Sequence, residues 1–158
     1  MPGTDEIQVH MCKVAVGRPG DVLRATLGSC VGIGFLWRDG GMCGLAHCLL
    51  PSTSASPLHI GAKYVTEALP SLLTLMRLQP RHYRAVDAVI AGGASMVERI
   101  SAPFHEAIGD ANAKAARDGL ARLGIRLVAD DTGGKHGRQI TIDCANYTSS
   151  VRFIDRPT

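Results

Sequence analysis

A cysteine and a histidine stand 17 residues apart in the segment TLGSCVGIGFLWRDGGMCGLAHCLLP, residues 26–51. Cys30 follows a Gly-Ser pair, and His47 lies after the turn signal Arg38-Asp39-Gly40-Gly41. If this segment folds as a hairpin, the two side chains face each other on strands about 4.8 Å apart. A thiol becomes an effective nucleophile at neutral pH beside an imidazole, so the pattern permits cysteine-hydrolase chemistry. The competing interpretation is that Cys30 is only a small core residue.

The residues just before the cysteine fit the same chemistry. Gly28 leaves room for a substrate to approach the sulfur. The backbone N–H groups of Ser29 and Cys30 are placed to point at the oxyanion that forms when a thiolate attacks an amide carbonyl. The segment therefore permits acyl transfer at the open mouth of a hairpin, although the spacing alone leaves the function undecided.

Short strands and two helices must position these residues within one domain covering 1–158. Alternating apolar residues and turn signals predict a mixed α/β or α+β fold with a largely antiparallel sheet layered with helices. The segment 52–60, rich in Ser, Thr and Pro, is expected to form a surface loop over the site, and Pro70 to kink the first helix. Strands are expected over 7–16, 42–50, 85–90, 125–129, 139–144 and 150–154, and residues 22–37 are expected to form one extended segment with glycines at its centre. Helices are expected over 61–78 and 110–123.

The composition argues against several classes of protein. The formal net charge is only +3 and aromatic residues make up 4%, which disfavours nucleic-acid binding. The N-terminal segment lacks a signal-peptide pattern and the apolar stretches fall short of the roughly 18 residues of a membrane span, so we expect a cytoplasmic protein without membrane insertion. The five cysteines are odd in number and lack zinc-ribbon spacing, so we expect reduced thiols, no metal and no cofactor.

Several motifs occur together in an order that resembles the CheD family of chemoreceptor glutamine deamidases. The interval between Cys30 and His47 also matches that family, and the resemblance extends over residues 7–154. The matching segments are LGSCVGI at 27–33, GLAH at 44–47 with LLP at 49–51, Lys63-Tyr64, AGGASM at 91–96, Ile108-Gly109 with Asn112, and DTGG at 131–134 followed by Arg138.

The resemblance implies an αββ sandwich of the cysteine-hydrolase type and a definite chemistry. Cys30 would attack the carboxamide of a glutamine on a chemoreceptor cytoplasmic helix, and His47 would hold the thiol proton and deliver it to the departing ammonia. Ser95, with Gly28 and Ser29, is expected to line the cleft or the oxyanion site. Family members carry a threonine where this chain has Arg24, so Thr26 or a backbone carbonyl is expected to orient the imidazole.

Two other functions remain open at this point. The resemblance also implies a regulatory module that docks on a CheC-type phosphatase with little or no catalysis. A thiol redox sensor built on Cys30 with Cys43 or Cys48 is the third possibility. Zinc binding by Cys43, His47 and Cys48 is disfavoured because a strand turns Cys48 to the face opposite His47. Elsewhere, Asn112 is expected near a helix start and Arg138 in solvent.

Overall fold

This computed structural model describes residues 5–53, 59–95 and 102–154, with the backbone alone over 102–107. The described strands and helices follow the chain in an order close to the one predicted. They are β1 (Glu6–Gln8), β2 (Val14–Gly17), β3 (Val22–Leu27), β4 (Val31–Trp37), β5 (Met42–Cys48), α1 (Val65–Leu75), the 3-10 helix η1 (Pro80–Ala85), β6 (Asp87–Gly92), α2 (Ala102–Leu123), β7 (Arg126–Thr132), β8 (Gly137–Asp143) and β9 (Thr148–Ile154).

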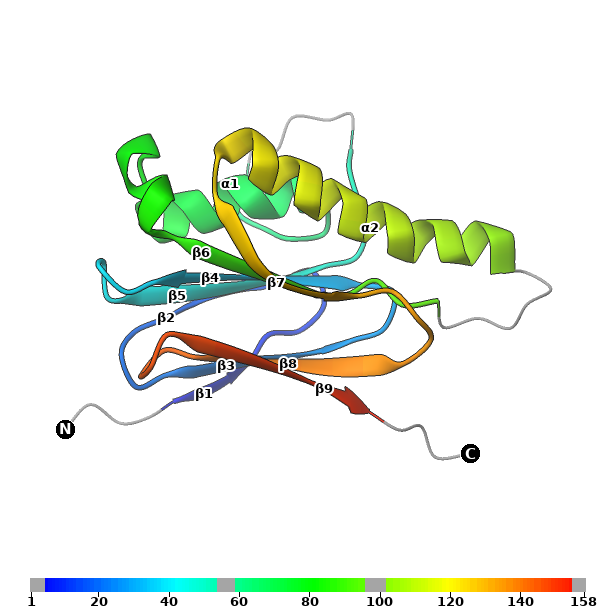
Figure 1. Cartoon of the computed structure of the whole chain (residues 1–158), viewed down its shortest axis with the longest axis horizontal. Coiled ribbons are helices and arrows are strands. Elements are labelled where there is room, and N and C mark those ends of the chain that lie inside the picture. Colours follow the sequence, from blue (N-terminus) through cyan, green and yellow to red (C-terminus); the bar gives the residue numbers. More distant parts are fainter. Residues whose placement is uncertain (1–4, 54–58, 96–101, 155–158) are drawn as a thin grey trace.

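Three layers make up the molecule (Figure 1). A five-stranded sheet, in the order β2-β5-β4-β6-β7, forms the middle layer, with α1 and α2 on one side of it. A four-stranded sheet, in the order β1-β3-β8-β9, lies on its other side. The predicted αββ sandwich is therefore confirmed. Pairing is mostly antiparallel as expected, but there are two sheets rather than one, and the pairs β1–β3 and β6–β7 are parallel.

The middle sheet is buried on both faces, which explains the nearly unbroken apolar sequence of β4 and β5. Ile33 and Phe35 pack in the core beneath the helices, whereas Leu45 packs in the core between the sheets. Gly34 faces the second sheet, where a Cβ atom would lie 2.7 Å from Ile142. Gly34 therefore allows the two sheets to pack closely against each other.

The structure corrects several predicted boundaries. The expected strand 7–16 is two strands in different sheets, because Cys12 has a φ of 71° in the turn between them. The expected extended segment 22–37 is also two strands, β3 and β4, which lie in different sheets. The first helix is shorter than predicted and contains Pro70 inside it. The second begins at Ala102 rather than near residue 110, and η1 was not predicted.

Candidate active site

Cys30 immediately precedes β4 and packs in the core between the two sheets, and His47 lies near the end of β5. The register pairs His47 with Gly32, so Cys30, two residues before Gly32, is a diagonal neighbour of His47 rather than directly opposite as predicted. A Cβ atom on Gly32 would lie 3.1 Å from the Leu27 side chain of β3, which shows that this face looks toward the four-stranded sheet. The thiol and the imidazole therefore project into the same layer of the molecule.

Both groups lie beneath the surface rather than at the open mouth that we expected. Cys30 is 4% exposed and His47 is 5% exposed. Burial, with a smaller contribution from the nearby Cys12, raises the pKa of the Cys30 thiol to about 11. Burial also lowers the pKa of His47. At neutral pH the resting site therefore holds an uncharged thiol and an uncharged imidazole.

The hydrogen bond of His47 fixes which ring nitrogen carries the proton. Nδ1 lies 2.9 Å from the carbonyl oxygen of Val9. A carbonyl only accepts, so the neutral imidazole carries its proton on Nδ1 and keeps a lone pair on Nε2. Nε2 is buried and has no hydrogen-bond partner in the described structure. This tautomer is the one that a base needs in order to take a proton from Cys30.

Backbone hydrogen bonds of residues 9–13, the segment before β2, fix the position of the Val9 carbonyl next to His47. The N–H of Val9 donates to the carbonyl of Arg24 on β3 over 2.7 Å. The N–H of Cys12 donates to the carbonyl of His47 over 2.8 Å, and the N–H of His47 donates to the carbonyl of Lys13 over 2.9 Å. The imidazole is therefore oriented by main chain, which a search for polar side chains does not reveal.

The prediction that Thr26 orients His47 is wrong. Thr26 is exposed, whereas its neighbours Ala25 and Leu27 are buried, because successive strand residues point to opposite faces. Thr26 therefore projects from the outer face of the four-stranded sheet, away from the hairpin. The backbone carbonyl of Val9 is the group in contact with the imidazole, which was the alternative expectation.

The turn before Cys30 has its peptide planes fixed by hydrogen bonds to its carbonyls. The Gly28 carbonyl accepts from the N–H of Ala94 over 3.0 Å, and the Ser29 carbonyl accepts from Nδ2 of Asn112 over 2.9 Å. In a trans peptide the N–H points away from the carbonyl. The N–H groups of Ser29 and Cys30 are therefore directed away from Ala94 and Asn112, and within the described residues neither donates to another residue's carbonyl.

Asn112 connects the two segments that carry the thiol and the imidazole. It is fully buried in the middle of α2 rather than at a helix start, and its Nδ2 also donates to the Leu49 carbonyl over 3.0 Å. Both neighbours are carbonyls, so the amide orientation is unambiguous. One side chain therefore ties the turn before Cys30 to the residues after His47, a role that the expected position near a helix start does not predict.

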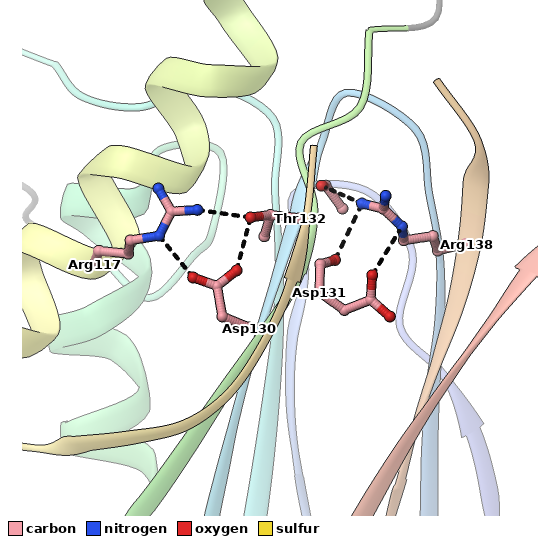
Figure 2. Close-up of polar contacts among 6 residues, drawn as sticks. Arg117, Asp130, Asp131, Thr132 and Arg138 are labelled. Carbon is pink, nitrogen blue, oxygen red and sulfur yellow. Dashed lines mark hydrogen bonds and ion pairs between the residues drawn. The ribbon is translucent and has the colours of Figure 1, made fainter. Parts of the chain in front are cut away.

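Gly92 and Gly93 press against the other side of Cys30. A Cβ atom on Gly92 would lie 2.2 Å from the Cys30 carbonyl oxygen, and the N–H of Gly93 donates to that oxygen over 2.8 Å. Figure 2 shows the guanidinium that holds this turn: Arg138 donates through Nη1 to the carbonyls of Gly92 and Asp131, over 2.7 and 3.0 Å. Arg138 is 3% exposed, so the expectation of a solvated arginine is wrong.

Ser95 lines a cavity that adjoins this turn. The cavity has a volume of about 240 Å³ and is bounded by Gly93, Ser95, Asp110, Gly134 and Lys135. The N–H of Ser95 donates to the Gly134 carbonyl over 2.9 Å, whereas its buried Oγ has no partner in the described structure. Since the N–H of Gly93 donates to the Cys30 carbonyl, the cavity lies next to the main chain of Cys30. Met96 lies outside the described residues.

The remaining cysteines lie in other surroundings. Cys43 packs beside Cys144, at the end of β5 far from His47, and Cys48 packs in the core beneath the helices. Cys43 lies at the opposite end of β5 from the residues next to Cys30, and Cys48 packs on the helix side of the sheet whereas Cys30 packs between the sheets. The structure therefore does not support the predicted redox pairs of Cys30 with Cys43 or Cys48. Within residues 5–53, 59–95 and 102–154, no cluster of three His, Cys, Asp or Glu residues could hold a metal ion. Cys12 lies close enough to Cys30 to contribute to the raised pKa of its thiol.

Comparison with known proteins agrees with the motifs that frame this site. A probable chemoreceptor glutamine deamidase CheD 2 of Ruegeria sp. is 38% identical, over 96% of this chain and 93% of that protein. A probable chemoreceptor glutamine deamidase CheD of Pyrococcus abyssi is 41% identical, over 95% and 91%. In structure, a Neisseria meningitidis protein of the DUF152 family is similar with a TM-score of 0.48 and 11% identity, over 83% of this chain and 64% of that one.

No helix in the described part of the chain is long and apolar enough to cross a membrane. The family model for CheD chemotactic sensory transduction matches residues 49–153, which begin just after the β4–β5 hairpin and include Asn112 and Arg138. Together with relatives that match nearly the whole length, this match places the chain in the CheD family.

Proposed function

We propose that this protein converts glutamine side chains of chemoreceptors into glutamates, with Cys30 as nucleophile and His47 as base. The observation that carries the proposal is the state of His47, whose Nδ1 is occupied by Val9 while Nε2 is free on the face shared with Cys30. The names of the relatives, which are probable chemoreceptor glutamine deamidases, supply the substrate class.

The first half of the reaction forms a thioester. As the glutamine carboxamide reaches Cys30, Nε2 of His47 takes the thiol proton and the sulfur attacks the carbonyl carbon. His47 then gives that proton to the amide nitrogen, the C–N bond breaks and ammonia leaves. No hydrogen bond joins the thiol and the imidazole in the described structure, so the proton transfer requires the closer approach that a bound substrate imposes.

The second half hydrolyses the thioester. His47 takes a proton from a water molecule, the hydroxide attacks the acyl carbon, and the Cys30 sulfur leaves with the proton returned by the imidazolium. The products are glutamate and a regenerated thiol. Both halves pass through an oxyanion, for which the N–H groups of Ser29 and Cys30 are the proposed donors, since Asn112 and Ala94 hold the adjoining carbonyls. Gly28 and Ser95 are proposed to line the cleft.

The test is a soluble receptor cytoplasmic fragment incubated with the wild type, Cys30→Ala and His47→Ala, with each glutamine followed by peptide mass spectrometry. We expect conversion by the wild type, none by Cys30→Ala, and at least about a hundredfold slower conversion by His47→Ala. Conversion by Cys30→Ala would rule out the nucleophile. A wild type that converts no glutamine on any receptor would reject the proposed reaction.

Docking on a CheC-type phosphatase stays a prediction, because no comparison names such a partner and no contact in the structure favours it. We also propose a cytoplasmic location, on the basis that the cytoplasmic helices of receptors are the proposed substrate. The absence of nucleic-acid binding likewise stays a prediction from charge and aromatic content.

A further inference from the structure

Two segments beside His47 carry the same three kinds of exposed side chain. The first is His10-Met11-Cys12-Lys13 and the second is His59-Ile60-Gly61-Ala62-Lys63. In each, the histidine, the large apolar residue and the lysine are exposed. Met11 is 51% exposed and Ile60 is 47% exposed, which makes them two of the few large apolar side chains on the surface.

Backbone hydrogen bonds place the two segments next to each other along the end of β5. The N–H of Ala62 donates to the Cys12 carbonyl over 3.2 Å, which joins the segments directly. Lys13 accepts from the N–H of His47, and Lys63 accepts from the N–H of Leu49 over 3.1 Å. We refer to the exposed side chains of residues 10, 11, 13, 59, 60 and 63 as the cationic rim. It borders the strand end that carries the proposed base.

The two lysines of the rim have no carboxylate partner among the described residues. Neither segment contains Asp or Glu, and in the described structure neither Lys13 nor Lys63 forms an ion pair. The nearby carboxylate of Glu67 is buried and is already in contact with His59 over 3.2 Å. The amine of Lys63 lies 5.5 Å from the centre of the Tyr64 ring, a contact that keeps it at the surface.

We propose that the cationic rim docks the acidic face of an amphipathic helix and so presents a neighbouring glutamine to Cys30. The proposal rests on the proposed function, since the helix belongs to the receptor that is deamidated. Exposed amines complement carboxylates on such a helix, and Met11 and Ile60 complement its apolar stripe. Each turnover adds a carboxylate to the receptor, so earlier deamidation strengthens the attraction for the next glutamine on that helix.

The experiment measures binding in the Cys30→Ala background, so that no conversion changes the ligand. The probe is a fluorescently labelled receptor cytoplasmic fragment, prepared in a glutamine form and a glutamate form. The two forms differ at the sites that the wild type converts. If the wild type converts none, they differ at the methylation sites of the receptor. We expect the glutamate form to bind more tightly. Lys13→Gln with Lys63→Gln should weaken binding of the glutamate form by about tenfold at low salt, and the difference should shrink at high salt.

The matched control removes the same charge at the other end of the sheet, with Arg81→Gln and Arg84→Gln on η1. This control should bind as the Cys30→Ala protein does. Met11→Ser with Ile60→Ser should also weaken binding, with little dependence on salt. Lysine variants that bind like the control, or a glutamine form that binds as tightly as the glutamate form, would overturn the proposal.

An activity measurement separates this proposal from the proposed function. With Cys30 intact, the lysine variants should raise KM for the receptor fragment, leave kcat unchanged and leave the rate of Cys30 alkylation by iodoacetamide unchanged. A wild type that never converts glutamine, combined with rim-dependent binding, rejects the reaction and keeps the docking surface. Conversion by the lysine variants with an unchanged KM rejects the docking surface and keeps the reaction.

Discussion

Burial keeps the Cys30 thiol protonated until a substrate reaches it. Its pKa is raised to about 11, and the pKa of His47 is lowered, so a thiolate–imidazolium pair is disfavoured in the resting protein. We therefore predict that the rate of Cys30 alkylation by iodoacetamide keeps rising as pH increases from 7 toward 11. Peptide mapping by mass spectrometry distinguishes Cys30 from the partly exposed Cys12. A rate that reaches its plateau below pH 8 would show a preformed ion pair and contradict this account.

Asn112 is the residue whose loss should separate catalysis from substrate binding. Asn112→Leu keeps much of the volume but leaves the Ser29 and Leu49 carbonyls without their donor. We predict that the free energy of unfolding falls by about 2 kcal/mol, because two buried acceptors lose their partner. We also predict that kcat falls at least about tenfold with KM little changed, since the Cys30 N–H is no longer held toward the proposed oxyanion position.

Asn146→Leu is the control for this substitution, because Asn146 is exposed and its side chain makes only a surface contact with Asp143. Urea unfolding and steady-state deamidation of the receptor fragment are the two measurements. If Asn112→Leu retained the wild-type kcat, Asn112 would be a core residue without a positioning role.

Helix α2 approaches the turn after β6 most closely where Gly109 faces Gly93. A Cβ atom on Gly109 would lie 2.6 Å from the Gly93 carbonyl oxygen and 2.9 Å from that of Ala94. We predict that Gly109→Ala pushes the helix off the turn that supports Cys30, lowering the free energy of unfolding by about 2 kcal/mol and slowing deamidation.

Gly119→Ala is a control within the same helix, since the added methyl group meets only the flexible Leu69 side chain. There the gain in helix propensity, about 1 kcal/mol, offsets the crowding, and activity should be unchanged. Equal losses of activity in the two variants would show that the contact with Gly93 has no special importance.

Two arginine networks flank β7, and they should differ in their contribution to stability (Figure 2). Arg117 of α2 binds Asp130 and Thr132 over 2.7 Å each, but its side chain is 44% exposed. The side chain of Arg138 is 4% exposed and binds carbonyls of the glycine turns. We predict that Arg138→Lys costs about 3 kcal/mol, because lysine lacks the planar fork of donors.

Arg117→Lys should cost less than about 1 kcal/mol, as expected for an exposed ion pair. Urea unfolding of both variants checks the comparison. Equal losses would mean that burial does not decide the contribution of these arginines.

Strand periodicity predicted most of the elements and contained one signal that was missed. Arg138 stands at even spacing from Ile140 and Ile142 on β8, so alternation places it on the buried face. The same alternation places Thr26 opposite to Leu27, on the outer face. By contrast, the role of the Val9 carbonyl is carried by main chain, and the break at Cys12 depends on a left-handed backbone conformation. Side-chain patterns do not encode either feature.

The layered architecture places the proposed chemistry where the two cores meet. Cys30 belongs to the core between the sheets, and the turn before it is held by α2 from the helix layer through Asn112. The site therefore depends on the packing of all three layers, and conditions that loosen the whole molecule should disable it before unfolding is complete.

Buried thiols should make the whole molecule sensitive to alkali. Burial raises the pKa of Cys30 to about 11 and raises the pKa of Cys43, Cys48 and Cys144 above the ordinary value near 9.0. Above pH 9 the unfolded chain releases these protons while the folded protein keeps them, so the unfolded state binds fewer protons and stability decreases as pH rises. We predict that the contribution of the thiols to the free energy of unfolding is constant below pH 9. Between pH 9 and 11 this contribution should decrease, and the free energy of unfolding should decrease with it.

Urea unfolding at pH 7.5, 9 and 10.5 measures this decrease, and Cys48→Ala isolates the thiol contribution from that of lysine and tyrosine. Cys48 is fully buried, so its removal costs stability at pH 7.5 but also removes a group that the unfolded state ionises. The difference in stability between the wild type and Cys48→Ala should therefore narrow as pH rises. A difference that stays constant from pH 7.5 to 10.5 would show that the thiol of Cys48 ionises equally well in the folded and unfolded states, contrary to its place in the core.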